Sequence, residues 1–111
     1  MASVSNLAID QGTTYSVTIQ VTDATGSPRN LAGYTARSQL RRSYYTESNT
    51  AFTVNIDAPG AGEIDLSLTA NQTSALKSGR YVYDVELVAN ATSTVERIVE
   101  GIVTVYPEAT K

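Results

Sequence analysis

The residues best suited to binding chemistry gather in the stretch 78–87, SGRYVYDVEL, where two tyrosines and two carboxylates lie within ten residues. Tyrosine rings offer flat contact surfaces and carboxylates bind cations, so this composition is compatible with a small ligand site. Calcium, however, needs at least about six oxygen ligands and a loop that wraps it. A cation site built from Asp84 and Glu86 alone is therefore weakly supported.

The order of these residues favours a β-strand with two different faces. Alternating side chains of a strand point to opposite sides of its sheet. One face then carries Tyr81, Tyr83, Val85 and Leu87, and the other carries Val82, Asp84, Glu86 and Val88.

The spacing of Gly79, Tyr81 and Tyr83 also matches the start of the F strand in an immunoglobulin domain, where a corner tyrosine bonds to nearby backbone. We expect the Tyr81 hydroxyl to reach backbone near a helical turn, and Tyr83 to fill core volume. These three residues are therefore predicted to be structural.

A second group of candidates lies in the stretch 41–48, RRSYYTES. Tyrosine and arginine are enriched where proteins bury surface against partners. Arg42, Tyr44 and Tyr45 are accordingly predicted to lie at a partner interface. An equally good interpretation is that one tyrosine packs down and the other lies over the edge of the sheet.

The last predicted strand, residues 95–106, is apolar on both faces, which indicates that something covers its outer side. Val99, Val103 and Val105 are assigned to the core. The partner face is predicted to consist of Ile98, Ile102 and Tyr106, together with Val82 and Val88. A β-bulge at Gly101 would switch the faces and is the alternative.

Seven short segments with alternating apolar residues are expected to form strands. They lie around Val4–Ile9 and in residues 15–22, 34–41, 52–56, 64–68, 80–89 and 95–106. A capping box at Thr69 and Gln72 predicts a short helix over residues 70–77, with Gly79 as a stop. The chain is therefore interpreted as one domain, residues 1–111, with an all-β, immunoglobulin-like antiparallel sandwich fold. An up-and-down barrel is the alternative.

Composition excludes several classes of function. The 111 residues include no histidine and no cysteine, which removes thiolate nucleophiles, Ser-His-Asp triads and disulfides. The net charge of −3, without a basic cluster beyond Arg41 and Arg42, argues against nucleic-acid binding. The N-terminal stretch predicts no signal peptide, and no segment is apolar enough to span a membrane. We expect no enzymatic activity, cofactor, metal or small-molecule substrate.

Four stretches in order, 7–15, 30–41, 78–87 and 97–108, give the chain a resemblance to small β-sandwich structural proteins of tailed bacteriophages. That group includes the collar proteins that anchor lateral tail fibres. The resemblance implies a non-enzymatic virion protein made in the bacterial host cytoplasm. It would act as a homo-oligomeric ring subunit or adaptor at a collar, neck or baseplate, in contact with other phage structural proteins. Within those stretches, Gly12 is expected in a tight crossing between sheets and Gly33 in the turn into the next strand.

Two other functions remain open from the sequence. One is capsid decoration, in which the same domain caps the shell of a virion. The other is a carbohydrate-binding module that stacks exposed tyrosines on sugar rings.

Overall fold

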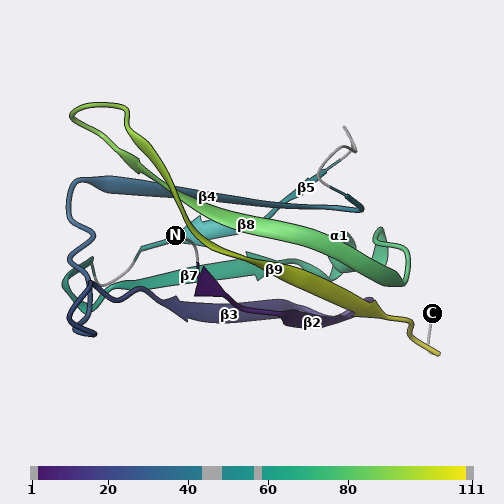
Figure 1. Ribbon diagram of the computed structural model, residues 1–111. Helices are drawn as coiled ribbons and strands as arrows, with labels where there is room; N and C mark the ends of the chain where they lie inside the picture. The colour runs from purple at the N-terminus through teal and green to yellow at the C-terminus, as the bar shows by residue number, and fades with distance from the viewer. Residues whose placement is uncertain (1–2, 44–48, 57–58, 110–111) are drawn as a thin grey trace.

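In the computed structural model, two β-sheets pack face to face (Figure 1). The structure describes residues 3–43, 49–56 and 59–109. The larger sheet has the order β1/β2–β9–β8–β4–β5, and the smaller has the order β3–β7–β6. The fold is an immunoglobulin-like β-sandwich, as the alternation of apolar residues predicts. The larger sheet contains β1 (Ser3–Val4), β2 (Leu7–Asp10), β4 (Tyr34–Arg41), β5 (Thr50–Ala51), β8 (Gly79–Ala89) and β9 (Val95–Tyr106). The smaller contains β3 (Tyr15–Gln20), β6 (Thr53–Asn55) and β7 (Glu63–Leu68).

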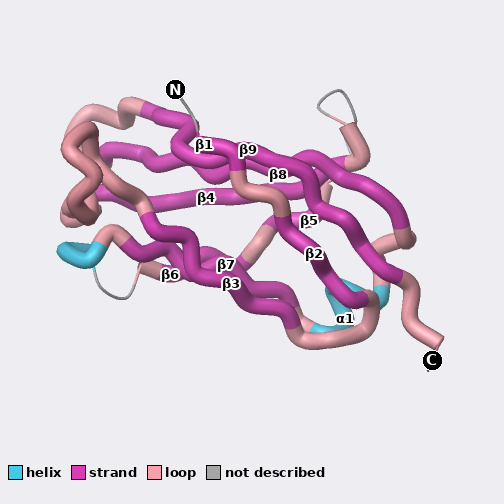
Figure 2. Tube along the Cα trace, turned by 60° about the horizontal axis from the view of Figure 1, so that its bottom comes forward, coloured by secondary structure: helices cyan, strands magenta, loops and turns pink. Residues whose placement is uncertain are grey.

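The strand expected at residues 52–56 is present as β6, residues 53–55, and the residues just before it form a separate short strand, β5, in the other sheet. β5 pairs with β4 in the larger sheet, whereas β6 pairs with β7 in the smaller one. Phe52, which lies between them, is buried. The crossing places one large apolar side chain in the core instead of continuing a single strand, and Figure 2 shows the chain leaving β5 for the other layer.

The predicted helix is present but shorter than expected. It spans α1 (Ala70–Ser74), and both halves of the capping box at Thr69 and Gln72 are made. Ala75 forms the C-cap, so Gly79 does not end the helix. Gly79 instead opens β8, with a φ of +129°. The part of the chain described by the structure contains no helix that could cross a membrane.

The core lies between the sheets and is built from the inward residues of each strand. In β8 these are Tyr81, Tyr83, Val85 and Leu87, all buried as the alternation predicts. Two buried polar side chains are satisfied by backbone. Ser38 donates to the Asp84 carbonyl at 2.6 Å, and Thr73 donates to the Thr13 carbonyl at 2.8 Å.

The assignment of Ile98 to the outer face of β9 is wrong. A bulge in β9 sets Val99 opposite Val85 but Arg97 opposite Glu86, so Ile98 is the extra residue. The extra residue turns Ile98 inward beside Val99, and only 8% of it is exposed. The bulge therefore occurs at Ile98 and not at Gly101, which pairs in register with Tyr83.

Candidate interaction face

The start of β8 forms the predicted tyrosine corner. The Tyr81 hydroxyl donates to the Lys77 carbonyl at 2.7 Å, and the Arg42 guanidinium lies 4.6 Å from the centre of the Tyr81 ring. Arg42 also donates to the carbonyls of Ser78 and Arg80, at 3.2 and 3.3 Å. A side chain on Gly79 would run into the Arg42 guanidinium. Arg42, predicted to contact a partner, is thus engaged in holding this corner within the domain.

Tyr83 fills the centre of the core, as predicted, and also ties down the N-terminal edge. Only 1% of Tyr83 is exposed, and its ring meets Phe52 edge to face at 6.2 Å. Its hydroxyl donates to the Ser5 carbonyl, between β1 and β2. Gly101 allows this approach, because a Cβ there would overlap the Ser5 backbone. Burial raises the pKa of the Tyr83 hydroxyl, so it remains a donor.

The turn glycines named from the sequence lie at positions that require left-handed backbone. Gly12 has a φ of +80° between β2 and β3, and Gly33 has a φ of +82° just before β4. Both belong to the framework of the fold, away from the candidate site.

The candidate site is the outer face of the larger sheet, meaning the outward side chains of β4, β8 and β9. Cross-strand register arranges them in four successive rows. The rows are Ile102–Val82–Arg41, Glu100–Asp84–Gln39, Arg97–Glu86–Arg37 and Val95–Val88–Thr35. Two charged rows therefore lie between two rows that contain apolar pairs.

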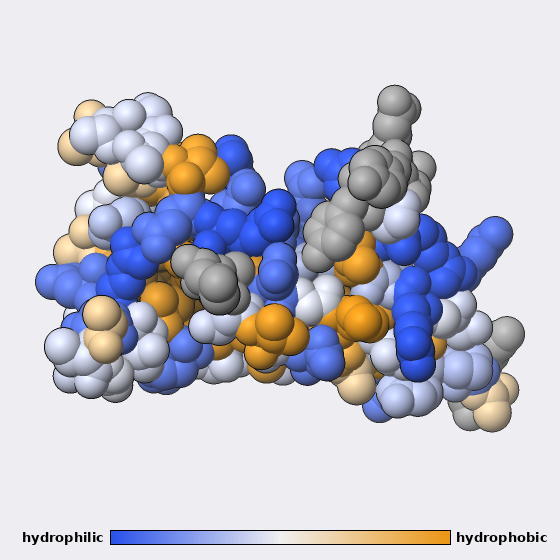
Figure 3. Space-filling view, viewed as in Figure 1, coloured by the Kyte–Doolittle hydropathy of each residue, from blue (hydrophilic) through white to orange (hydrophobic). Residues whose placement is uncertain are grey.

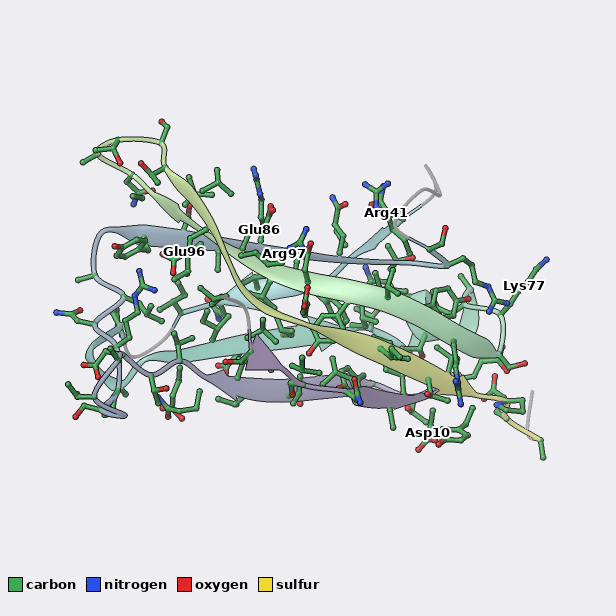
Figure 4. All side chains as sticks on the ribbon, in the orientation of Figure 1. Asp10, Arg41, Lys77, Glu86, Glu96 and Arg97 are labelled. Carbon is green, nitrogen blue, oxygen red and sulfur yellow. The ribbon has the colours of Figure 1, made fainter. Side chains whose placement is uncertain are left out.

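Ion pairs connect the two charged rows. Arg37 contacts Glu86 at 2.7 Å, and Arg97 contacts both Asp84 and Glu100 at 3.3 Å. Figure 4 shows Arg41, Glu86 and Arg97 on the outer side of the larger sheet, away from the smaller one. The carboxylates considered as cation ligands thus have arginine partners.

Asp84 has an unusual environment for a surface carboxylate. Burial, and then the neighbouring Glu86 carboxylate, raise its pKa, while Arg97 and Arg41 act in the opposite direction. A hollow of about 330 Å³ lies over this position, next to Gln39 and Arg41. The surroundings of Asp84 therefore disfavour its ionised form, although an arginine lies beside it.

Apolar side chains flank the charges. Ile102 is 42% exposed and faces Val82, while Val95 is 46% exposed and faces Val88. Tyr106, near the end of β9, is 52% exposed. Figure 3 shows apolar side chains as separate patches among hydrophilic ones on the side of the molecule that β9 crosses. Of the predicted interface residues, four therefore project from the outer face of the larger sheet: Val82, Val88, Ile102 and Tyr106. Tyr44 and Tyr45 lie outside the described residues.

The outer face of the smaller sheet has a different character. Its outward positions are polar throughout, and Thr18 donates to the Asp65 carboxylate at 2.8 Å. These positions are Ser16, Thr18, Gln20, Thr53, Asn55, Glu63, Asp65 and Ser67. The exposed large apolar side chains of the described chain, by contrast, all belong to β1 and β9 of the larger sheet.

Comparison with known proteins supports the fold. No family model matches the chain, and no curated protein is similar to it. Among solved structures, the N-terminal domain of phage TP901-1 ORF48 is similar, with a TM-score of 0.58 and 11% identity over 94% of this chain and 97% of that domain. Listeria monocytogenes InlP gives a TM-score of 0.51 and 18% identity over 94% of this chain. This chain spans only 26% of InlP. The NK cell receptor Nkp44 gives 0.49 and 16% identity, with 96% and 99% covered. The similarities to the phage domain and to InlP, at identities this low, establish a shared fold alone.

Sequence reasoning missed Val95 and the pairing of the charged rows. Val95 faces Val88 because the bulge at Ile98 shifts the register of β9 by one residue; without the bulge, Glu96 would face Val88. The alternating charges of Asp84, Glu86, Arg97 and Glu100 were visible in the sequence. Their contacts required the register between β8 and β9, which the sequence pattern does not specify.

Proposed function

We propose that this domain is a non-enzymatic structural subunit of a bacteriophage virion. It acts as a ring subunit or adaptor at a collar, neck or baseplate and anchors tail fibres through oligomeric contacts of the β-sandwich. Two lines of support combine: the sequence resembles phage sandwich proteins, and the fold is shared with a phage protein domain. The observation that carries the proposal is the contrast between the two outer faces.

The chemistry of the outer face suits contact with protein. Apolar pairs beside an ordered set of charges are typical of an interface with an apolar centre and a polar surround. The outward residues of the smaller sheet are polar, so that face lacks the apolar pairs that a protein partner could cover.

A second copy of the chain is the partner that the charges favour. The row of Glu100 and Asp84 is acidic, and the next row contains Arg97 and Arg37. Another copy turned to lay one row over the other brings opposite charges together. Such complementarity fixes the register of a contact more than its affinity.

Sedimentation at increasing protein concentration tests this proposal. The unaltered chain is expected to self-associate, and Ile102→Asp is expected to weaken association by about tenfold or more, because it buries an unpaired charge. Ser16→Asp, on the outer face of the smaller sheet, is the matched control and should associate normally. A chain that stays monomeric at high concentration, or a Ser16→Asp variant as defective as Ile102→Asp, would contradict the proposal.

A further inference from the structure

One edge of the larger sheet is left without a partner strand in the described structure. β5 pairs with β4 only at Gln39 and Leu40, and the Phe52 N–H donates to the Ser38 carbonyl at 3.0 Å. From Phe52 onward the chain enters the smaller sheet as β6. The first half of β4, residues 34–37, therefore has β8 on one side and no described strand on the other.

The free backbone groups of this edge belong mainly to Ala36. In an antiparallel strand, the N–H and C=O groups of successive residues point to alternate sides. The Ser38 carbonyl points toward β5, where it accepts from Phe52, and the Gly33 carbonyl points toward β8, where it accepts from Asn90. The N–H and C=O of Ala36 consequently point past the end of β5. Unpaired groups of this kind are a template for an added strand.

An apolar hollow of about 230 Å³ lies directly beneath this edge. It is lined by Tyr34, Thr35, Ala36, Val54 and Ile56. Four of these side chains are apolar and pack, half-buried, against the core. A cavity of about 150 Å³ is enough to hold a benzene molecule, so the hollow has room for one large apolar side chain.

The wall of the hollow is held in place by a charged pair. The Arg29 guanidinium lies 5.3 Å from the centre of the Tyr34 ring and donates to the Tyr34 hydroxyl at 3.4 Å. Arg29 in turn pairs with Glu96 through two contacts of 2.9 and 3.0 Å. Tyr34 is thereby fixed before any ligand arrives, which reduces the entropy lost on binding.

We propose that this edge binds an extended segment of a partner polypeptide, which adds a strand beside Ala36 and inserts one large apolar side chain into the hollow. The N–H and C=O of Ala36 are both free and point to the same side, so they match the backbone groups of a peptide. The ligand is therefore an extended chain. In the partner segment, the two residues that flank the inserted side chain point toward the outer face of the sheet, next to Thr35 and Arg37. The Arg37 guanidinium pairs with Glu86 at 2.7 Å, but the Arg37 side chain remains 61% exposed, so an acidic residue of the segment can share it.

A second copy of this chain is a poorer occupant. Pairing two β4 edges about a two-fold axis brings the small Ala36 side chain of the copy to the hollow, which it cannot fill. The partner segment thus has the pattern acidic, large apolar, polar, and is supplied by a different sequence. Apart from Thr35 and Arg37, which also belong to the outer face, this binding mode uses only groups of the edge and the hollow, and it does not rest on the proposed function.

The test uses a capped five-residue peptide, Glu-Phe-Thr-Ser-Thr, which begins opposite Arg37 and so ends short of β5, added to isotope-labelled protein and followed by NMR. Binding should shift the Ala36 amide and the methyl signals of Val54 and Ile56, and slow exchange of the Ala36 amide by about tenfold at saturation. Two control peptides, one with aspartate in place of phenylalanine and one N-methylated at phenylalanine, should bind about tenfold more weakly or worse. Ile102→Asp should leave peptide binding unchanged.

Three results would overturn the proposal. One is the absence of any change at Ala36 at millimolar peptide, and another is equal binding of all three peptides. The third is protection of the Ala36 amide that rises with protein concentration in the absence of peptide, since a second copy would then occupy the edge.

Discussion

Neighbouring residues of β8 face opposite ways and meet very different surroundings. On the inner face, Tyr81 and Tyr83 are buried, and each hydroxyl is bonded to a specific carbonyl. On the outer face, Asp84 and Glu86 pair with arginines of the adjacent strands and remain half-exposed. The same strand therefore stabilises the sandwich with one set of side chains and presents the other set to solvent on the outer face. The comparison teaches that tyrosines suited to ligand binding by type serve the fold here, and that position decides between the two roles.

The largest expected effect comes from emptying the inner face. Tyr83→Ala should lower the free energy of unfolding by about 3–5 kcal/mol, because it leaves a cavity beside Phe52 and frees the Ser5 carbonyl. Urea unfolding measures this loss. Val82→Ala, the adjacent residue on the outer face, is the control and should change stability by less than about 1 kcal/mol. Equal losses at both positions would remove the distinction between the faces.

A smaller loss is expected at the corner. Tyr81→Phe deletes the hydroxyl that donates to the Lys77 carbonyl but keeps the ring under Arg42. The free energy of unfolding should fall by about 1 kcal/mol, the usual net value of one hydrogen bond. Thermal unfolding of this variant beside Tyr83→Phe would compare the two hydroxyls directly. No change in Tyr81→Phe would mean that the corner bond is replaced by water.

The ion pairs of the outer face should contribute little to folding. Arg37→Gln removes one partner of the Glu86 pair, whose arginine is largely exposed, so stability should fall by less than about 0.5 kcal/mol. The small difference from the unaltered chain should shrink further in concentrated salt, which screens exposed charges. A loss as large as that of Tyr81→Phe would show that the outer face also holds the fold together.

The smallest effect is a dependence on pH that has opposite signs at two carboxylates. The pKa of Asp84 is raised in the folded protein. Its contribution to the free energy of unfolding is therefore fully present below the unfolded pKa of about 3.9, and it is lost as the pH rises through the folded pKa. Arg29 lowers the pKa of Glu96, so that contribution is present above the unfolded pKa of about 4.3 and is lost as the pH falls through the folded value.

Unfolding of Asp84→Asn and Glu96→Gln between about pH 3 and pH 7 separates these signs. Relative to the unaltered chain, Asp84→Asn should gain stability as the pH rises, whereas Glu96→Gln should lose it. Parallel curves for the two variants would contradict the assigned environments.

Much of the fold was predictable because period-2 alternation is long and regular in β8 and β9. The capping box at Thr69 and the corner at Tyr81 were also predictable, since each depends on local spacing. Ile98 was misplaced because a bulge adds one residue and reverses the faces, and nothing in the apolar run around it marks the position. The separate strand β5 at residues 50–51, which joins the other sheet from β6, was missed for a related reason. Alternation shows that Phe52 is inward, but not which sheet each neighbour joins.

The candidate site was partly predictable. Apolar residues on the wrong side of an alternating strand pointed to Ile102, Tyr106, Val82 and Val88, and all four lie outward or half-exposed. The contacts of Arg42 with the corner were not predictable, because they join residues far apart in sequence. The free edge at Ala36 depends on where β5 stops pairing, which sequence pattern does not record.

Labelling of single cysteines tests the central claim most directly, because the chain contains no cysteine of its own. Ile102→Cys and Ser16→Cys place one thiol on the outer face of each sheet. We predict that both react with maleimide at similar rates in the isolated chain. In the assembled oligomer or virion, only Ile102→Cys should become protected, with labelling slowed by about tenfold or more. Protection of Ser16→Cys instead, or unchanged labelling of Ile102→Cys in the assembly, would contradict the assignment of the outer face of the larger sheet as the interface.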